Sequence, residues 1–379
     1  MCIRDRYLAV LIEITMVKVL VIFCLFYTCL GFSQDQNSFD LQKQLDSLNT
    51  ATSNLIELGR YYLALQLNKK ADSILLKNLD SISVSAAYYS LNKGRVDAFY
   101  NRAVEAEKNL IKAKLIFKQE LGSSHPAYIK CIHSLGIFYR GSGSYNNAAL
   151  SYEELKIVLS KTYGKRDSQY IACLNEMGLL FKDDQKYNKA EQYLLEAKKI
   201  QSLILKPDHP DLASTLNNLA ILYKNMGRYP EAIYNYSEAL RIRELHLGKQ
   251  HVLYTSVLLN LANLYIDLGN YQMSEKTFLE AIKLREKEHG NKHPYYATSI
   301  EGLALLYKDM GIYSKAIEYS MDANNIRAAS LGEYSVVYAG GLSNLAQIYT
   351  LAGYYNAVSY THLRAHETDS YLVCRLLLE

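Results

Sequence analysis

Residues 216–233 carry the sequence LNNLAILYKNMGRYPEAI. Apolar residues recur three and four positions apart, stop at Gly227 and resume directly after it. This pattern predicts two amphipathic helices joined by a tight turn. A single helix pair of this length cannot bury its own apolar face, so the missing partner surface must come from elsewhere in the chain.

The turn position held by Gly227 recurs every 42 residues in both directions. Its equivalents are Gly59, Asn101, Gly143, Gln185, Gly269, Gly311 and Gly353. Two residues after each turn stands a tyrosine, with Ala103 as the exception. Four residues before the later turns stands an aromatic residue, namely Tyr139, Phe181, Tyr223, Tyr265, Tyr307 or Tyr349. These two positions account for much of a composition with 34 tyrosines and no tryptophan. A fixed period of this size is typical of repeat proteins.

Small residues follow the same period. Seven residues before the turn they are Gly94, Gly136, Gly178, Ala220, Ala262, Ala304 and Ala346. Five residues after it they are Ala64, Ala106, Ala148, Ala190, Ala232, Ser274 and Ala316. Closely crossing helices need small side chains at the contact, so these positions predict where the two helices of each pair meet.

Short connectors separate the pairs. They contain His125-Pro126, His209-Pro210 and His293-Pro294, and a glycine stands three residues before the first and the last of these pairs. Proline is tolerated in the first turn of a helix. Each repeat is therefore expected to be a first helix (helix A), a tight turn, a second helix (helix B) and a short loop. The predicted fold is all-α, a right-handed superhelical solenoid of stacked antiparallel helix pairs, each burying its apolar face against its neighbours.

The arrangement LNNLAxLYxxxGxYxEA followed by REL, LG and His resembles the tetratricopeptide repeat, in the 42-residue form found in kinesin light chains. The resemblance is strong over residues 120–357, where the last repeat is truncated. It is weak over residues 41–119, because Lys93, Asp97 and Asn101 depart from the pattern. We interpret residues 41–119 as degenerate N-terminal helical repeats.

The resemblance implies a scaffold that binds a protein or an extended peptide in a groove formed by successive A helices. Asparagines in such a groove can donate to and accept from a peptide backbone, and lysines would favour an acidic partner. Glu301 and Gly302 interrupt the row. The alternative is that these are ordinary solvated polar residues. The expected partner-binding residues are Asn175, Lys182, Asn217, Asn218, Lys224, Asn260, Asn263, Lys308 and Asn344.

Several function classes find no support in the sequence. The net charge of +4 comes from 42 basic and 38 acidic residues without a basic run, so no nucleic-acid partner is indicated. No phosphate-binding loop, HExxH or CxxC motif is present, so we expect no enzyme, no cofactor and no small-molecule substrate.

The histidines and cysteines are also expected to serve structure. His125, His209, His251 and His293 fall in separate connectors, roughly 15–20 Å apart, which predicts a role at helix starts and no metal site. The same spacing keeps Cys131 and Cys173 too far apart for a disulfide.

The two ends of the chain have an unusual relation. Met1-Cys2-Ile3-Arg4-Asp5 can be encoded by ATG TGT ATA AGA GAC, whose complementary strand encodes Val-Ser-Tyr-Thr-His, the sequence of residues 358–362. We interpret both ends as translated DNA adapters, which leaves residues 1–15 as adapter-derived or untranslated upstream sequence and 358–379 as an adapter-derived tail. The protein is then expected to continue beyond Ala357.

Residues 16–33 have a charged start at Lys18, an apolar core and a small residue at Ser33, and so resemble a secretory signal peptide. Residues 34–40 would be a linker. We therefore expect an exported protein, periplasmic or secreted. The alternative is a protein anchored in the membrane by this segment if it stays uncleaved.

Two functions remain open on the sequence. The first is a non-catalytic scaffold that binds a partner in the groove. The second is the sensing or adaptor region of a longer protein that carries a caspase-type peptidase or a histidine-kinase effector, as similar bacterial proteins do.

Overall fold

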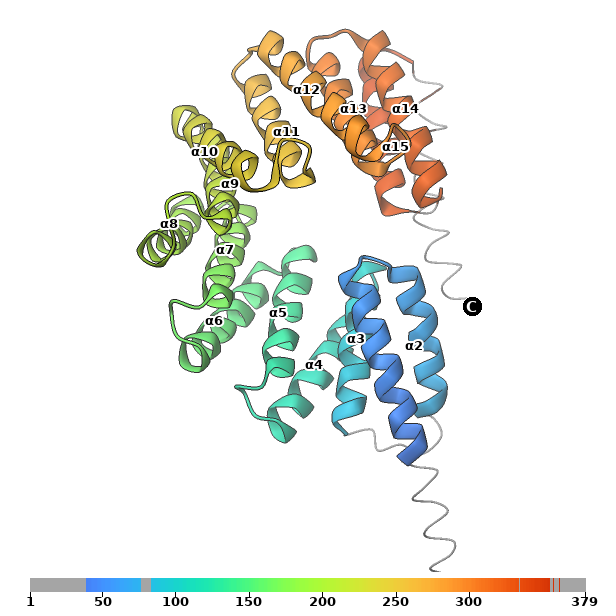
Figure 1. Cartoon of the computed structure of the whole chain (residues 1–379). Helices are drawn as coiled ribbons and strands as arrows, with labels where there is room; N and C mark the ends of the chain where they lie inside the picture. The colour runs from blue at the N-terminus through green and yellow to red at the C-terminus, as the bar shows by residue number, and fades with distance from the viewer. Residues whose placement is uncertain (1–38, 76–82, 334, 355–356, 358–360, 362–379) are drawn as a thin grey trace, which may run out of the picture. The chain divides into compact units, whose positions relative to one another are not determined.

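The computed structural model describes residues 39–75, 83–333, 335–354, 357 and 361. The chain divides into two compact units, Met1–Val158 (unit 1) and Leu159–Glu379 (unit 2). Within the described residues all regular structure is helical, and consecutive helices pack as pairs (Figure 1). The predicted all-α fold of stacked helix pairs is confirmed.

Unit 1 begins with a helix over residues 39–57, followed by α2 (Tyr61–Leu75). The next pairs are α3 (Val84–Phe99) with α4 (Ala103–Glu120), and α5 (Pro126–Gly141) with α6 (Tyr145–Thr162). The boundary between the units falls inside α6. The described residues within 41–119, the segment interpreted as degenerate repeats, thus form helix pairs as well.

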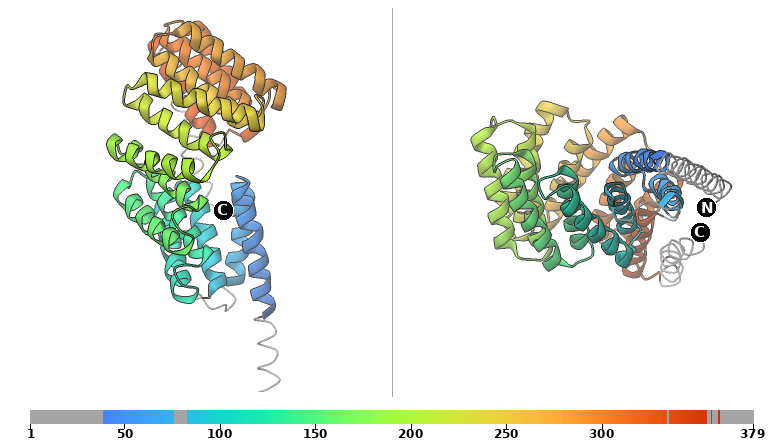
Figure 2. Two further views of the ribbon diagram at one scale, coloured as in Figure 1. Left: turned by 60° about the vertical axis from the view of Figure 1, so that its left-hand side comes forward. Right: turned by 90° about the horizontal axis from the view of Figure 1, so that it is seen from below.

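Unit 2 continues the same alternation of A and B helices, shown from further directions in Figure 2. Its A helices are α7 (Ser168–Asp183), α9 (Pro210–Asn225), α11 (Val252–Asp267), α13 (Pro294–Asp309) and α15 (Val336–Leu351). Its complete B helices are α8 (Tyr187–Ile204), α10 (Tyr229–Leu247), α12 (Tyr271–His289) and α14 (Tyr313–Leu331).

The 42-residue period fixes the helix starts. Each A helix from α3 to α15 begins 42 residues after the previous one, and each B helix begins two residues after the turn position. All eight turn positions have positive φ, including the non-glycine residues Asn101 and Gln185, both at 57°. The shared register therefore imposes the left-handed turn even where glycine, the residue that adopts it without strain, is absent.

The connector histidines cap the A helices. The Nδ1 atoms of His125, His209, His251 and His293 each accept a hydrogen bond from the backbone N–H two residues further on, at 3.1–3.2 Å. Asp167 does the same for α7. This contact satisfies one of the backbone donors that a helix start leaves unpaired. The predicted role of these histidines at helix starts is confirmed.

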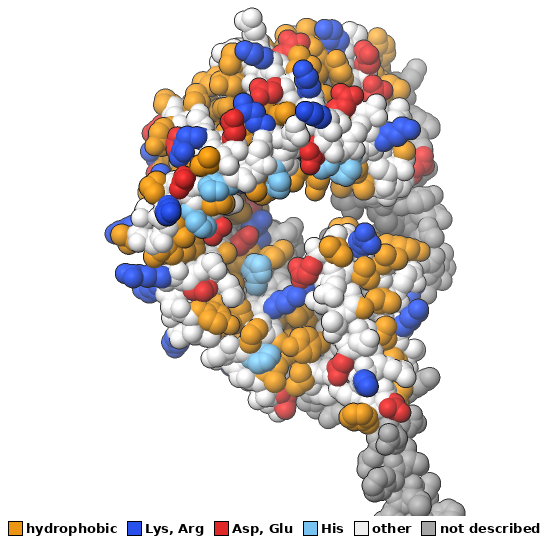
Figure 3. Space-filling view, in the orientation of Figure 1, with side chains coloured by type: hydrophobic (Ala, Val, Ile, Leu, Met, Phe, Trp, Pro, Cys, Tyr) orange, Lys and Arg blue, Asp and Glu red, His pale blue; other side chains and the backbone are white. Residues whose placement is uncertain are grey.

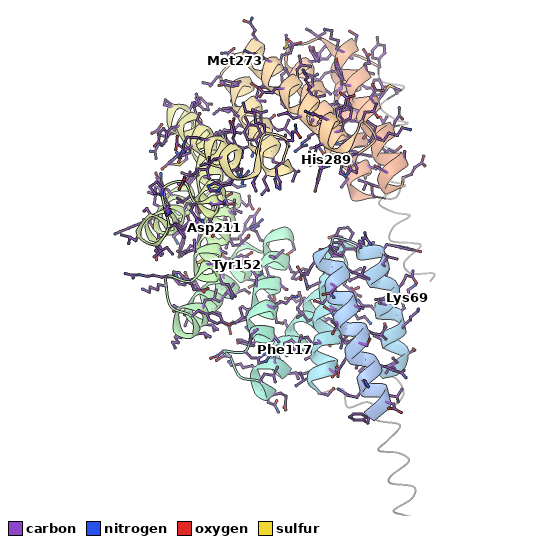
Figure 4. All side chains as sticks on the ribbon, in the orientation of Figure 1. Lys69, Phe117, Tyr152, Asp211, Met273 and His289 are labelled. Atoms are coloured by element: carbon purple, nitrogen blue, oxygen red, sulfur yellow. The ribbon has the colours of Figure 1, made fainter. Side chains whose placement is uncertain are left out.

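The small residues lie where the helices of a pair cross. A Cβ built on Gly136 would lie 2.6 Å from the ring of Tyr152, and one on Gly178 would lie 2.5 Å from Leu194. Tyr152 and Phe117, both labelled in Figure 4, are fully buried, as is Ala232. Close approach at small residues thus leaves room for large side chains beside them, as the period indicated.

Several expectations concern residues outside the described part. These are the adapter-derived residues 1–15, the signal peptide 16–33, most of the linker 34–40 and, apart from residue 361, the tail 358–379. In the described part, none of the helices has the length and apolar character needed to cross a membrane. The first described helix begins at residue 39, inside the segment taken as linker.

Candidate functional site

Successive A helices of unit 2 contact one another: α7 packs against α9, α9 against α11, and α11 against α13. The predicted partner-binding residues lie on these helices and, in the case of Asn344, on α15, at register positions that share one helix side. We call this side the A face. Its polar residues are Asn175, Lys182, Asn217, Asn218, Lys224, Asn260, Asn263, Glu301, Lys308 and Asn344.

Most A-face asparagines are tied to the neighbouring repeat. Asn218 Nδ2 donates to Asn175 Oδ1 at 3.3 Å, and Asn260 Nδ2 donates to Asn217 Oδ1 at 3.1 Å. Both bonds join residues 43 positions apart, so each links one A helix to the next. These amides are half-buried and already hold the stack of A helices together.

Among the six asparagines of the A face, Asn175 has both of its N–H donors in hydrogen bonds. Its Nδ2 group donates to the carbonyl of Ile171 at 3.2 Å and to Thr215 Oγ1 at 2.9 Å. An asparagine has two N–H donors, so none is left for a partner. Asn263 differs, because its side chain has no hydrogen bond within the described residues.

The row of asparagine pairs is absent between α11 and α13, where Leu259 and Gly302 hold the two positions. A Cβ on Gly302 would lie 2.4 Å from the ring of Phe278. The phenyl ring therefore occupies the space that a polar pair fills elsewhere. The predicted interruption at Gly302 thus has a steric cause in the preceding B helix.

Glu301 continues the row instead of interrupting it. Its Oε1 accepts a hydrogen bond from Asn344 Nδ2 at 3.0 Å, and its Oε2 lies 3.2 Å from Arg327 Nη1. Burial raises the pKa of the Glu301 carboxyl above its usual value, although Arg327 and Asn344 oppose the shift. A fully enclosed ion pair of this kind holds α13, α14 and α15 in one arrangement.

The A-face lysines are each paired with an aspartate of the same chain. Lys224 Nζ lies 3.0 Å from Asp267 of the next repeat. Lys182 and Lys308 pair with the adjacent residues Asp183 and Asp309 at 2.9 and 3.5 Å. Since each lysine has an aspartate beside it, the row of lysines does not present an excess of positive charge to a partner.

The cysteines of α5 and α7 lie inside the packed helices. Cys131 and Cys173 are buried free thiols. Burial raises the pKa of the Cys131 thiol to about 12. Among the residues that the structure describes, no group of three His, Cys, Asp or Glu side chains is arranged to hold a metal ion.

The sequence patterns predicted no functional site in unit 1. There Glu57, Arg95 and Lys130 lie together on the side of the helices 39–57, α3 and α5. One signal was available: the register position of Arg95 is held in the next three repeats by Ile137, Leu179 and Ile221. A charged residue at a position that is apolar in the next three repeats marks a local function or a compensating partner.

The chain is similar to known repeat families. Residues 170–244 and 254–329 match the family model described as tetratricopeptide repeat. No curated protein matches the chain.

Solved structures are also similar to the chain. One is BtubC (BKLC) from P. vanneervenii, at 22% identity and TM-score 0.49, covering 62% of this chain and 92% of that one. A second is a putative kinesin light chain with nearly identical repeats from Podosopora anserina, at 22% identity and TM-score 0.46, covering 55% and 98%. A third is a Rap protein complexed with Competence and Sporulation Factor, at 12% identity and TM-score 0.48, covering 88% and 99%. At these TM-scores the likenesses do not bear on function.

Proposed function

Because the chain carries tetratricopeptide repeats over residues 170–244 and 254–329, we propose that it is a non-catalytic scaffold that binds a protein or extended peptide on the A face of unit 2. The observation that carries the proposal is the half-buried amide of Asn263, which has no hydrogen bond within the described residues. An unused donor and acceptor of this kind matches the backbone of an extended peptide.

The contacts distinguish three kinds of asparagine among the predicted residues. Asn175 holds neighbouring A helices together and has no donor left, so its role in binding is indirect. Asn218 and Asn260 each donate one N–H to the preceding repeat, and the side-chain carbonyl oxygen of each can still accept a hydrogen bond from a partner. In Asn263, both the N–H donors and the carbonyl oxygen of the side chain can bond to a partner. The paired lysines give no reason to prefer an acidic segment over a neutral one.

The test begins with a peptide selected on the full chain from a library of random extended peptides. Asn263→Ala is expected to weaken its binding by more than about 1 kcal/mol, the usual contribution of a lost hydrogen bond, with the melting temperature unchanged. Titration calorimetry and thermal unfolding measure the two quantities.

Asn175→Ala is the matched control. It removes two internal hydrogen bonds and should lower the melting temperature. Equal affinity of the selected peptide for the Asn263→Ala variant and the unchanged chain would rule out the A face as its site.

We also propose that the protein is exported, on the basis of residues 16–33 alone. Expression of the gene from Met16 in a bacterium should give a mature protein whose first residue is Gln34. Mass spectrometry of the N-terminus measures this. A protein that keeps Met16 and stays with the membrane would favour the anchored alternative.

A further inference from the structure

Unit 1 contains a cavity of about 560 Å³ on the side of the helix over residues 39–57, α3 and α5. This volume lies within the range of about 300–1,000 Å³ that is usual for small-molecule sites. We call it the unit 1 pocket. Its charged lining residues are Glu57, Arg95 and Lys130, and its apolar walls include Tyr61, Phe99 and Ile137.

The charged end of the pocket already holds a carboxylate. Arg95 Nη1 and Lys130 Nζ each lie 3.0 Å from the same oxygen, Oε1 of Glu57. Burial acts to raise the pKa of the Glu57 carboxyl, but Lys130 and Arg95 outweigh it and lower the pKa below its usual value. Two cations on separate helices are thus positioned to share one anionic group, which is the geometry that a bound carboxylate requires.

Glu57 is the most exposed of the three charged residues at this end. Its side chain is 55% exposed, whereas that of Arg95 is only 18% exposed. Arg95 Nη1 has no aligned hydrogen-bond acceptor within the described residues despite its closeness to Glu57. A ligand carboxylate in the place of Glu57 would keep both cations paired, while the exposed carboxylate of Glu57 returned to water, so the exchange leaves no buried charge unpaired.

The other walls are apolar and partly aromatic. The rings of Tyr61 and Phe99 stack with their centroids 3.8 Å apart. Phe99 and Ile137 are each 48% exposed, so apolar surface remains uncovered beside the cations. The face of unit 1 seen in Figure 3 mixes hydrophobic, acidic and basic side chains. The aromatic ring of a ligand would make stacking and edge contacts with these side chains.

The cations are peculiar to the first repeats. In unit 2 the register position of Lys130 is held by Ala172, Ser214, Ser256, Thr298 and Gly340, and that of Arg95 by Leu179, Ile221, Asn263, Leu305 and Gln347. The pocket therefore does not follow from the repeat pattern that builds the A face. The charged residues Arg95 and Lys130 are therefore a feature specific to unit 1.

We propose that the unit 1 pocket binds a small aromatic carboxylate, whose carboxylate takes the place of Glu57 between Arg95 and Lys130 while its ring lies against Phe99 and Ile137. Glu57 acts as an internal competitor that keeps the two cations paired when the pocket is empty. This site is separate from the peptide-binding A face of unit 2.

The test uses phenylacetate and its neutral analogue phenylacetamide as probes, titrated into the full chain by calorimetry. Phenylacetate should bind at least about tenfold more tightly than phenylacetamide, because the amide lacks the charge that Arg95 and Lys130 recognise. Lys130→Met and Arg95→Met should each weaken phenylacetate binding about tenfold or more. Arg166→Met, at an exposed loop position of unit 2, is the matched control and should change nothing.

Glu57→Gln distinguishes a binding defect from a folding defect. Loss of the internal competitor should tighten phenylacetate binding several-fold, a gain that a misfolded chain cannot produce. Equal binding of the two probes, or no tightening in Glu57→Gln, would overturn the proposal. So would binding of a peptide that ends in phenylalanine with a free carboxylate in the absence of phenylacetate binding, since the pocket would then be a peptide subsite.

Discussion

At the scale of single residues, the turn positions show how strongly the repeat register acts on the backbone. Six of the eight turn positions are glycines, while Asn101 and Gln185 adopt the same left-handed conformation with φ of 57°. A side chain in this region costs roughly 1–2 kcal/mol, least for asparagine. The packing of the flanking helices must supply that energy at Gln185.

Gln185→Gly should therefore stabilise the protein. The relief of backbone strain exceeds the extra entropy that glycine loses on folding, so the free energy of unfolding should rise by up to about 1 kcal/mol. Chemical denaturation measures the change. The reciprocal variant Gly227→Gln, at φ of 72°, is the control and should lower stability by a similar amount. A destabilised Gln185→Gly variant would show that its side chain contributes packing that outweighs the strain.

At the scale of the helix, the histidine cap at position 293 makes the start of α13 sensitive to pH. His293 accepts from the backbone N–H of Tyr295 through Nδ1, which must be unprotonated to do so. Burial, and the nearby His289 and Arg285, lower the pKa of His293 below its usual value. The unfolded chain then binds the proton more readily than the folded chain, so stability falls as pH falls through the unfolded pKa of about 6.5.

His293→Asp is expected to reduce this loss. Aspartate remains an acceptor across this range, as Asp167 already is at the start of α7. The decrease in unfolding free energy between pH 7.5 and 5.5 should be smaller in the variant by up to about 1 kcal/mol, the usual contribution of a cap. Denaturant titrations at the two pH values measure it. An unchanged pH dependence would mean that the cap of α13 survives protonation.

Helix boundaries and pair crossings could be predicted because they depend on contacts inside one repeat. The period located the turn at Gly227 and the close approach at Gly178, and both are where the structure has them. The contacts between repeats could not be predicted in the same way. The asparagines were expected to face a partner, yet Asn218 donates to Asn175 across 43 residues, and whether any of them binds a peptide stays a prediction.

Glu301 shows the physical reason for this limit. It is buried together with Ser320 and Arg327 of the paired B helix, and Arg327 lies about two helix turns after Ser320 and pairs with the Glu301 carboxylate. The position of Ser320 is held in the four preceding repeats by Tyr152, Leu194, Tyr236 and Phe278, and that of Arg327 in the two preceding repeats by Arg243 and Arg285. The period therefore indicates a basic residue at position 327, but it does not show that a glutamate on the paired A helix would be buried against it. The unit 1 pocket was missed for a related reason, since its cations are exceptions to the repeat and not part of it.

At the scale of the whole molecule, each repeat of a stacked chain is stabilised mainly by itself and its two neighbours, so a local defect should remain local. Ala232 on α10 is fully buried where α9 and α10 cross. Ala232→Trp overpacks this crossing and should cost at least about 1–3 kcal/mol. Hydrogen exchange followed by mass spectrometry should show faster exchange in α9, α10 and α11, with α3 to α5 of unit 1 little changed.

Tyr234→Trp, on an exposed side of the same helix, is the control and should leave both regions protected. Equal loss of protection in α3 to α5 would mean that the chain unfolds as one cooperative body, because only then would a defect in one crossing lower the opening free energy of distant repeats.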